Sequence, residues 1–268
     1  MFIERTVRSV LGQGYPKLEH VVMDGGSTDN TLNLLQPYIQ HFHHFSSGPD
    51  QGQADAIARG FGQTSGDIMA YLNSDDLLAP GTLHFVANYF DQHPEVDFIY
   101  SHRCIIDAYD RVIGYWFLPP HTDYLMRRWD LIPQETCFWR RSLFETVGNV
   151  DSSYEFAMDY ELFVRMMARG KFRRVNRFLA AFRRHESSKT IQQFATVGTS
   201  EVRAIREKHG ISEHPRDQFF RTWFWLLVEH AGQRLAHSKN SLPGAFRGLG
   251  YNYDEVWGGW LRGIADSR

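Results

Sequence analysis

Four polar residues, Asn73-Ser74-Asp75-Asp76, directly follow an apolar run at residues 68–72. Carboxylates at the end of a buried strand are the kind of oxygen ligand that hard divalent cations prefer. Asn, Ser and Asp are also common turn residues, and Pro80 is well placed to open the next helix. Taken alone, the segment is compatible with a metal site and with an ordinary turn.

A second acidic segment, Asp24-Gly25-Gly26, follows another short apolar run. Ligands of open α/β sheets bind at the carboxyl ends of parallel strands, and Asp24 and Asp75 both fall just past such ends. The two glycines would let a ligand approach the backbone closely. The segment therefore suits a phosphate-binding turn or a nucleobase contact by Asp24, although any strand-to-helix turn has a similar composition.

The first 90 residues predict alternating helices and strands, as in a parallel α/β sheet. Apolar residues recur at helical spacing from Ile3 until Gly12 stops the first helix. Ser27 or Thr28 is expected to cap the second helix. The further helices are expected at residues 31–39, 54–61 and 80–90, and the strands at residues 19–23, 42–45 and 68–72.

The pattern changes after the third of these strands and its helix. Short strands with short connections follow, which favours antiparallel pairing and hence a mixed sheet. These strands are predicted at residues 96–100, 104–107, 112–116, 172–175 and 178–182, and helices at residues 141–147 and 160–168. From residue 196 onward the pattern is helical.

One late helix, predicted at residues 216–238, is amphipathic. Its apolar side would carry Phe219, Phe220, Trp223, Leu226 and Leu227. We expect this side to pack on the preceding domain. A homodimer contact is the second possibility and a peripheral membrane contact the third.

Composition sets limits on the class of protein. The chain has 268 residues, 43% of them hydrophobic, and a formal net charge of -2, which gives no indication of a nucleic-acid-binding face. Its two cysteines, Cys104 and Cys137, lack the spacing of metal ligands and are expected to be reduced core thiols. Glu4 and Arg5 interrupt any apolar leader. We expect a cytoplasmic location, with the inner face of the membrane as a second option.

Five segments, in this order, resemble motifs of the family 2 glycosyltransferases. The resemblance covers residues 2–195 and implies an α/β protein of the GT-A fold, with a mixed central sheet flanked by helices. We therefore expect a catalytic domain at residues 1–195 and a C-terminal helical extension at residues 196–268. The five segments are residues 22–31, 47–56, 72–76, 156–162 and 184–189.

The resemblance also implies roles for individual residues. Asp24 matches the residue that contacts the nucleotide base, and Asp159 matches the general base. Asn73-Ser74-Asp75 matches the Asp-x-Asp motif with Asn at its first position, so Asp75 is the expected metal ligand. The full donor-binding set is Asp24, Gly25, Ser27, Asp50, Gln53, Asn73, Ser74 and Asp75; the acceptor or diphosphate set is Glu135, Arg184 and His185; the metal set is Asp75 and His185.

These roles imply a metal-dependent inverting transferase. It would move a sugar from a nucleotide-sugar, expected to be a UDP-sugar, to a hydroxyl of a glycan or lipid-linked glycan in cell-envelope polysaccharide synthesis. Asp159 would take the proton of the acceptor, and Mg²⁺ or Mn²⁺ would neutralise the departing diphosphate, assisted by Arg183 and Arg184. The alternatives are a nucleotidyltransferase and a catalytically impaired nucleotide-sugar binding protein.

One departure from the family concerns the start of the chain. Relatives begin with an apolar strand before the helix that here starts at Phe2. Without it the sheet would have an open wall beside Asp24. We expect the chain to be truncated; filling of the gap by another segment or subunit, and impaired nucleotide binding, are the alternatives.

Overall fold

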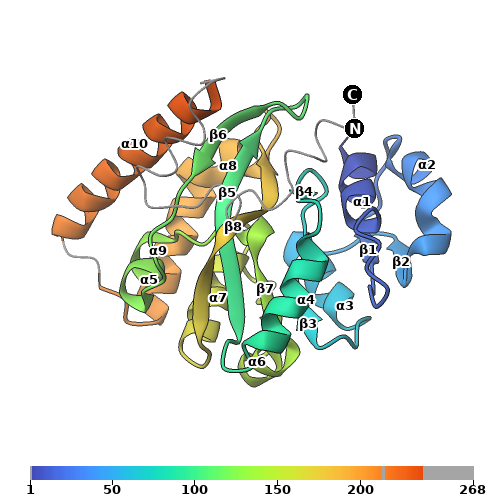
Figure 1. Ribbon diagram of the computed structural model, residues 1–268, viewed down its shortest axis with the longest axis horizontal. Helices are drawn as coiled ribbons and strands as arrows, with labels where there is room; N and C mark the ends of the chain where they lie inside the picture. The colour runs from blue at the N-terminus through green and yellow to red at the C-terminus, as the bar shows by residue number, and fades with distance from the viewer. Residues whose placement is uncertain (1, 213–214, 238–268) are drawn as a thin grey trace.

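The computed structural model describes residues 2–212 and 215–237. Helices and strands alternate in the first part of the chain, and only helices follow the last strand of the described residues (Figure 1). The helices are α1 (Ile3–Leu11), α2 (Thr31–Leu35), α3 (Gln53–Phe61), α4 (Thr82–Gln92), α5 (Asp123–Trp129), α6 (Arg141–Val147), α7 (Met158–Met167), α8 (Lys189–Gln193), α9 (Thr199–Lys208) and α10 (Pro215–His237). The strands are β1 (Val21–Asp24), β2 (His44–Ser47), β3 (Ile68–Met69), β4 (Leu77–Leu78), β5 (Phe98–Ile106), β6 (Val112–Trp116), β7 (Phe138–Arg140) and β8 (Phe172–Arg183).

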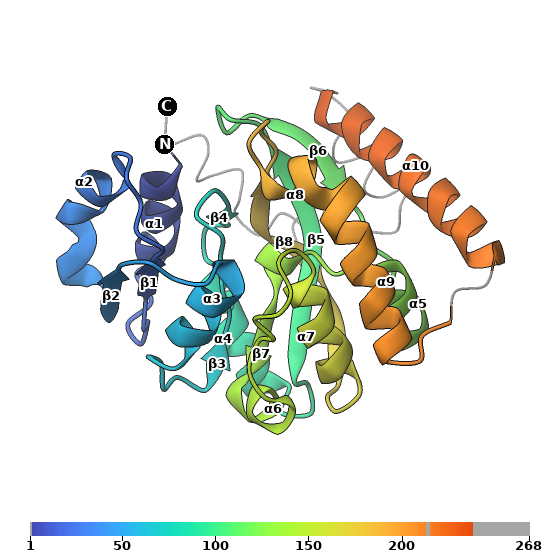
Figure 2. The same cartoon turned by 180° about the vertical axis from the view of Figure 1, so that it is seen from behind.

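A mixed sheet forms the centre of the molecule. Its strand order is β3-β7-β5-β8-β4, with β6 paired to β5. β5 and β8 are parallel, whereas β6 and β7 run antiparallel to β5, so the mixed sheet predicted from the sequence is confirmed. Helices lie on both faces, with α4 on one side and α7 on the other (Figures 1 and 2).

Alternate residues of β5 supply the two hydrophobic cores. Phe98 packs toward α7, where its ring lies 5.1 Å from that of Phe163. Ile99, the next residue, belongs instead to the core under α4 with Val86 and Phe90. This alternation follows from the two-residue period of a strand. It makes β5 the most enclosed strand of the sheet and a rigid support for its ends.

Two pairs of predicted short strands are each one continuous strand. The polar residues Ser101 and His102 interrupt the apolar pattern, yet both are buried inside β5. The ring of His102 contacts Asn176 Oδ1 at 2.9 Å and accepts from Leu118 N at 3.0 Å. Because partners distant in the sequence satisfy these polar groups, the strand continues through them. The prediction of a break was wrong, and the same holds for β8.

Other element predictions were also partly wrong. The second helix is shorter than predicted, its N-cap is Asn30 rather than Ser27 or Thr28, and a 3₁₀ segment over Gln36–His41 follows it. The predicted strand at residues 68–72 pairs only at Ile68–Met69, because its partner β7 is three residues long. The rest of the run is extended chain that leads to the Asp75 turn.

The long C-terminal helix α10 packs on β6, but not through the side predicted. Trp225 lies 4.4 Å from Trp116 of β6, and Phe224 contacts Trp129 of α5. The predicted apolar side is exposed. None of the described helices is both long enough and apolar enough to cross a membrane. The predicted extension at residues 196–268 lies partly outside the described residues.

The strand that ends at Asp24 and the strand that follows it in the chain form a separate small sheet. β1 and β2 pair in parallel, with Asp24 opposite Ser47. Among the described residues, this pair has no ladder to the mixed sheet. Side-chain and loop contacts attach it instead; the Glu19 carboxylate, for example, accepts from the N–H groups of Ser65 and Gly66 before β3. A hydrogen bond from the Ser65 hydroxyl, together with those from the two N–H groups, lowers the pKa of Glu19 to about 2.

Candidate functional site

The turn that follows β3 is held from two sides. From α1, Thr6 Oγ1 lies 2.9 Å from the carbonyl oxygen of Ser74 and 2.8 Å from that of Asp76. From the end of β8, Arg183 Nε donates to the carbonyl oxygen of Asp75 at 2.7 Å. These hydrogen bonds fix the backbone of the turn. The Asp75 side chain faces the loop after β8.

Asp75 and His185 contact each other across 110 residues of sequence. His185 Nε2 lies 3.0 Å from Asp75 Oδ2, and Nδ1 lies 2.9 Å from Ser187 Oγ. Both side chains remain partly exposed, at 26% for Asp75 and 13% for His185. The two residues predicted as metal ligands are therefore neighbours, and a hard cation that displaced the imidazole from the carboxylate could take both as ligands.

Asp76, the residue next to Asp75, already has a hydrogen-bond partner within the protein. The Asp76 carboxyl is buried and accepts from Arg183 N at 2.9 Å. Burial, followed by the charges of Glu135 and Asp75, raises the pKa of Asp76 well above its ordinary value. In the described residues, no group of three or more His, Cys, Asp and Glu is arranged to hold a metal ion. A cation at Asp75 and His185 would thus need further oxygen ligands from a bound anion or water.

Asn73 is part of a chain of side-chain amides. Its Oδ1 accepts from Gln53 Nε2 at 2.7 Å, and its Nδ2 donates to Gln134 Oε1 at 3.2 Å. Gln134 in turn donates to the carbonyl oxygen of Tyr71 at 2.8 Å. The amide chain, defined here as Gln53, Asn73 and Gln134, joins α3, the Asp75 turn and the 3₁₀ segment over Gln134–Thr136.

Asp24 organises the turn that follows β1. Its carboxylate accepts from the N–H groups of Gly26 and Ser27 and from the hydroxyls of Ser27 and Ser47. Burial opposes ionisation, but these hydrogen bonds outweigh it and lower the pKa of Asp24. A Cβ on Gly25 would lie 2.8 Å from Asp50 Oδ2, so the turn and the Asp50 loop are in close contact. Four residues of the predicted donor set thus lie together.

Asp159 lies in the first turn of α7. Its Oδ1 accepts from Tyr160 N at 2.8 Å, although the N-cap of the helix is Ala157. Burial raises the pKa of Asp159 to about 6, and the charge of Glu135 contributes in the same direction. Burial and the charge of Asp159 similarly raise the pKa of Asp130 to about 7. A carboxylate with such a pKa is suited to accept a proton near neutral pH.

Glu135 is engaged with Arg103. Both of its oxygens accept from the guanidinium at 2.8 Å, and its side chain is 1% exposed. The guanidinium also lies over the rings of Trp116 and Phe182, at 4.4 and 4.6 Å. The sequence predicts an acceptor or diphosphate contact for Glu135. In the structure, both carboxylate oxygens are already occupied.

Arg183, which ends β8, and Arg184, which follows it, have different surroundings. Arg183 is fully buried and binds the carbonyl oxygens of Asp75 and Asp107, so the predicted assistance at the diphosphate was wrong for this residue. Arg184 is half-exposed and lies 3.5 Å from Glu229 of α10. Sequence reasoning missed the positioning by Arg183, because nothing in the local sequence separates a buried arginine from a solvated one.

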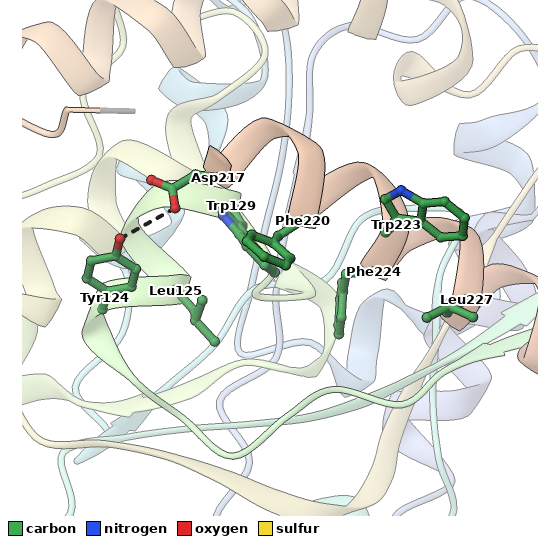
Figure 3. Close-up of a pocket in the computed structure, with 8 residues that line it drawn as sticks. All are labelled: Tyr124, Leu125, Trp129, Asp217, Phe220, Trp223, Phe224 and Leu227. Atoms are coloured by element: carbon green, nitrogen blue, oxygen red, sulfur yellow. Dashed lines mark hydrogen bonds between the residues drawn. The ribbon is translucent and has the colours of Figure 1, made fainter. Parts of the chain in front are cut away.

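A groove of about 470 Å³ lies away from these residues, between α5 and α10 (Figure 3). Tyr124 and Asp217 meet at one end of it, with 3.4 Å between the hydroxyl and Oδ1. Its other walls are apolar: Leu125, Trp129, Phe220, Trp223, Phe224 and Leu227. The groove brings together none of the predicted site residues.

The sequence is similar to known glycosyltransferases. A model of glycosyl transferase family 2 matches residues 2–148. An uncharacterized glycosyltransferase of Mycobacterium tuberculosis is 27% identical over 169 residues, which are 61% of this chain and 63% of that protein. A PGL/p-HBAD biosynthesis glycosyltransferase of Mycobacterium bovis is 30% identical over 161 residues, 59% of this chain and 61% of that protein. The matched region thus spans somewhat over three fifths of each relative.

Solved structures share the fold. TarS of S. aureus in complex with UDP-GlcNAc superimposes with a TM-score of 0.62 at 15% identity, covering 93% of this chain and 76% of TarS. The mannosyltransferase PcManGT of Pyrobaculum calidifontis, in complex with GDP-Man and Mn²⁺, gives a TM-score of 0.58 at 18% identity, covering 93% and 70%. The mixed α/β architecture is therefore that of the GT-A glycosyltransferases.

Proposed function

The chain belongs to glycosyl transferase family 2, and from this premise we propose that it transfers a sugar from a UDP-sugar to a hydroxyl of a glycan or lipid-linked glycan of the cell envelope, with inversion. The observation that carries the proposal is the 3.0 Å contact of His185 Nε2 with Asp75 Oδ2. It joins a carboxylate and an imidazole at the carboxyl end of β3, where α/β proteins bind their ligands.

The donor would lie across the two sheets. The Asp24 turn and Asp50 would contact the nucleoside, since their oxygens and N–H groups line the end of β1. Asp75 and His185 would hold a divalent cation, Mg²⁺ or Mn²⁺, which supplies charge neutralisation for the diphosphate. Because the described residues offer only these two ligands here, we propose that the cation binds together with the nucleotide.

The acceptor would be activated by Asp159. Its carboxylate would take the proton of the acceptor hydroxyl as that oxygen attacks the anomeric carbon, and the bond from this carbon to the nucleoside diphosphate would break on the opposite face. Its raised pKa supports this role, because a base with a pKa near the working pH both exists as carboxylate and holds the proton. Arg103 and Glu135 would fix the adjacent wall rather than touch the acceptor.

Removal of the Asp75 carboxylate tests the donor site. We expect the wild-type chain to bind UDP more tightly with Mn²⁺ than with EDTA, and Asp75→Ala to lose most of this difference, a fall of about tenfold or more. Titration calorimetry with UDP in both buffers measures it. Asp91→Ala, which removes an exposed carboxylate of α4, is the matched control. If the wild-type chain binds neither UDP nor GDP, the proposed function is wrong.

A further inference from the structure

Lys189, the first residue of α8, has a half-buried ammonium group with neutral partners. Its Nζ donates to Gln53 Oε1 at 3.1 Å and to the carbonyl oxygen of Glu155. The carboxylates whose charges act on Lys189 have other hydrogen-bond partners: Glu155 accepts from Gln193 Nε2 at 3.0 Å, Glu201 accepts from N–H groups that precede α7, and Asp159 accepts from Tyr160 N. Burial lowers the pKa of Lys189. A partly desolvated cation with only neutral acceptors would gain from contact with an anion.

Lys189 also fixes the direction of the amide chain. An ammonium group only donates, and the Tyr71 carbonyl at the other end only accepts. Each amide must therefore turn its oxygen toward Lys189 and its NH₂ group toward Tyr71, as the contacts require. Asn73 must accept from Gln53 and donate to Gln134. An aspartate has no N–H to donate, which gives a physical reason for Asn at this position.

The ammonium group lies near the Asp75 turn. Only the amide of Gln53 stands between Lys189 and Asn73, two residues before Asp75. Lys189 also follows His185 by four residues, and His185 contacts Asp75 directly. A phosphate bound through a cation at Asp75 and His185 would therefore have Lys189 among its neighbours.

We propose that Lys189 is a further binding residue of the donor site, whose ammonium group leaves Gln53 and binds a phosphate oxygen of the nucleoside diphosphate when the donor enters. The inference rests on the proposed function, since it takes a nucleotide-sugar as the ligand. A phosphate oxygen is a stronger acceptor than the neutral Gln53 oxygen, because both partners of the new hydrogen bond are charged. Until then, the hydrogen bond to Gln53 of the amide chain holds the Lys189 ammonium group in place.

Lys189→Gln tests this inference. Glutamine can still donate to Gln53 or to the Glu155 carbonyl, so a hydrogen bond from α8 to α3 or to the segment before α7 is preserved while the charge is lost. We expect the affinity for UDP to fall about tenfold or more and the affinity for uridine to stay unchanged, because only UDP carries the anion. Lys189→Arg should retain most of the UDP affinity. Calorimetry in EDTA and in Mn²⁺ measures these values, with GDP and guanosine as a parallel pair.

The controls separate the possible outcomes. Lys17→Gln removes one exposed positive charge elsewhere and should leave both affinities unchanged. Unchanged UDP binding by Lys189→Gln would overturn the inference and leave the proposed function standing. An equal loss for UDP and uridine would also overturn it, because it would indicate a structural role. If the wild-type chain binds neither UDP nor GDP, both proposals fail.

Discussion

Asp159→Asn is expected to lower the turnover number of sugar transfer by about 10²- to 10⁴-fold, the usual contribution of a general base. Asparagine keeps the size of the side chain and can still accept from Tyr160 N, so α7 should begin as in the wild-type chain. It cannot take a proton from the acceptor hydroxyl. The rate of transfer from UDP-sugars is measured through the release of UDP.

The same residue sets an expected pH dependence. With a pKa of about 6, raised from the ordinary 3.8, Asp159 is protonated below that pH and is the active carboxylate above it. We therefore expect kcat/KM to fall about tenfold per pH unit below pH 6 and to level off above about pH 7.

The control for this variant is donor binding. Asp159→Asn should bind UDP with Mn²⁺ as tightly as the wild-type chain does, and it should unfold at no lower temperature. Undiminished transfer would remove Asp159 from the mechanism. Loss of transfer together with loss of UDP binding would instead indicate a damaged cleft.

Glu135→Gln is expected to destabilise the protein by about 3–5 kcal/mol, the usual cost of leaving one member of a buried ion pair without its partner. The Arg103 guanidinium would remain enclosed by Trp116 and Phe182 without its hydrogen-bonded counter-charge, and only the more distant charges of Asp76 and Asp159 would act on it. Arg103→Met should cost a similar amount. Denaturant unfolding at neutral pH measures both.

A double-mutant cycle sharpens this result. Because each single change leaves the other group buried without its partner, Glu135→Gln combined with Arg103→Met should cost less than the two single changes added together. Arg59→Met breaks an exposed pair with Asp55 in α3 and should change stability by no more than about 1 kcal/mol. A Glu135→Gln chain with wild-type stability but no transfer would return Glu135 to the acceptor site.

Local sequence patterns predicted the mixed α/β fold and the segments that carry the candidate site residues. Apolar periodicity located α3 and α6 to within one residue, since a helix or strand that buries one face shows it in its own residues. The order of five segments brought Asp75 and His185 into one prediction. The structure places them 3.0 Å apart.

Pairings between distant residues were not predictable in this way. Arg103 and Glu135 are 32 positions apart, and each read alone suggests a solvated charge or a ligand contact. Ser101 and His102 look like the end of a strand, because their burial depends on partners far along the chain, Leu179 for Ser101 and Asn176 for His102. On α10, two apolar sides compete, and only the position of Trp116 decides that Trp225 packs inward.

The separation of the small β1–β2 sheet from the mixed sheet affects how tightly the proposed donor site would bind a ligand. Since its backbone ladder is confined to β1 and β2 among the described residues, this pair can open without breaking any hydrogen bond of the mixed sheet. Asp24 is the last residue of β1 in the small sheet, whereas Asp75 lies in the turn between β3 and β4 of the mixed sheet. A ligand that contacted both would spend part of its interaction energy on holding the two units, the small sheet and the mixed sheet, in one arrangement. Affinity for such a ligand would then depend on how firmly the Glu19 hydrogen bonds hold the units together.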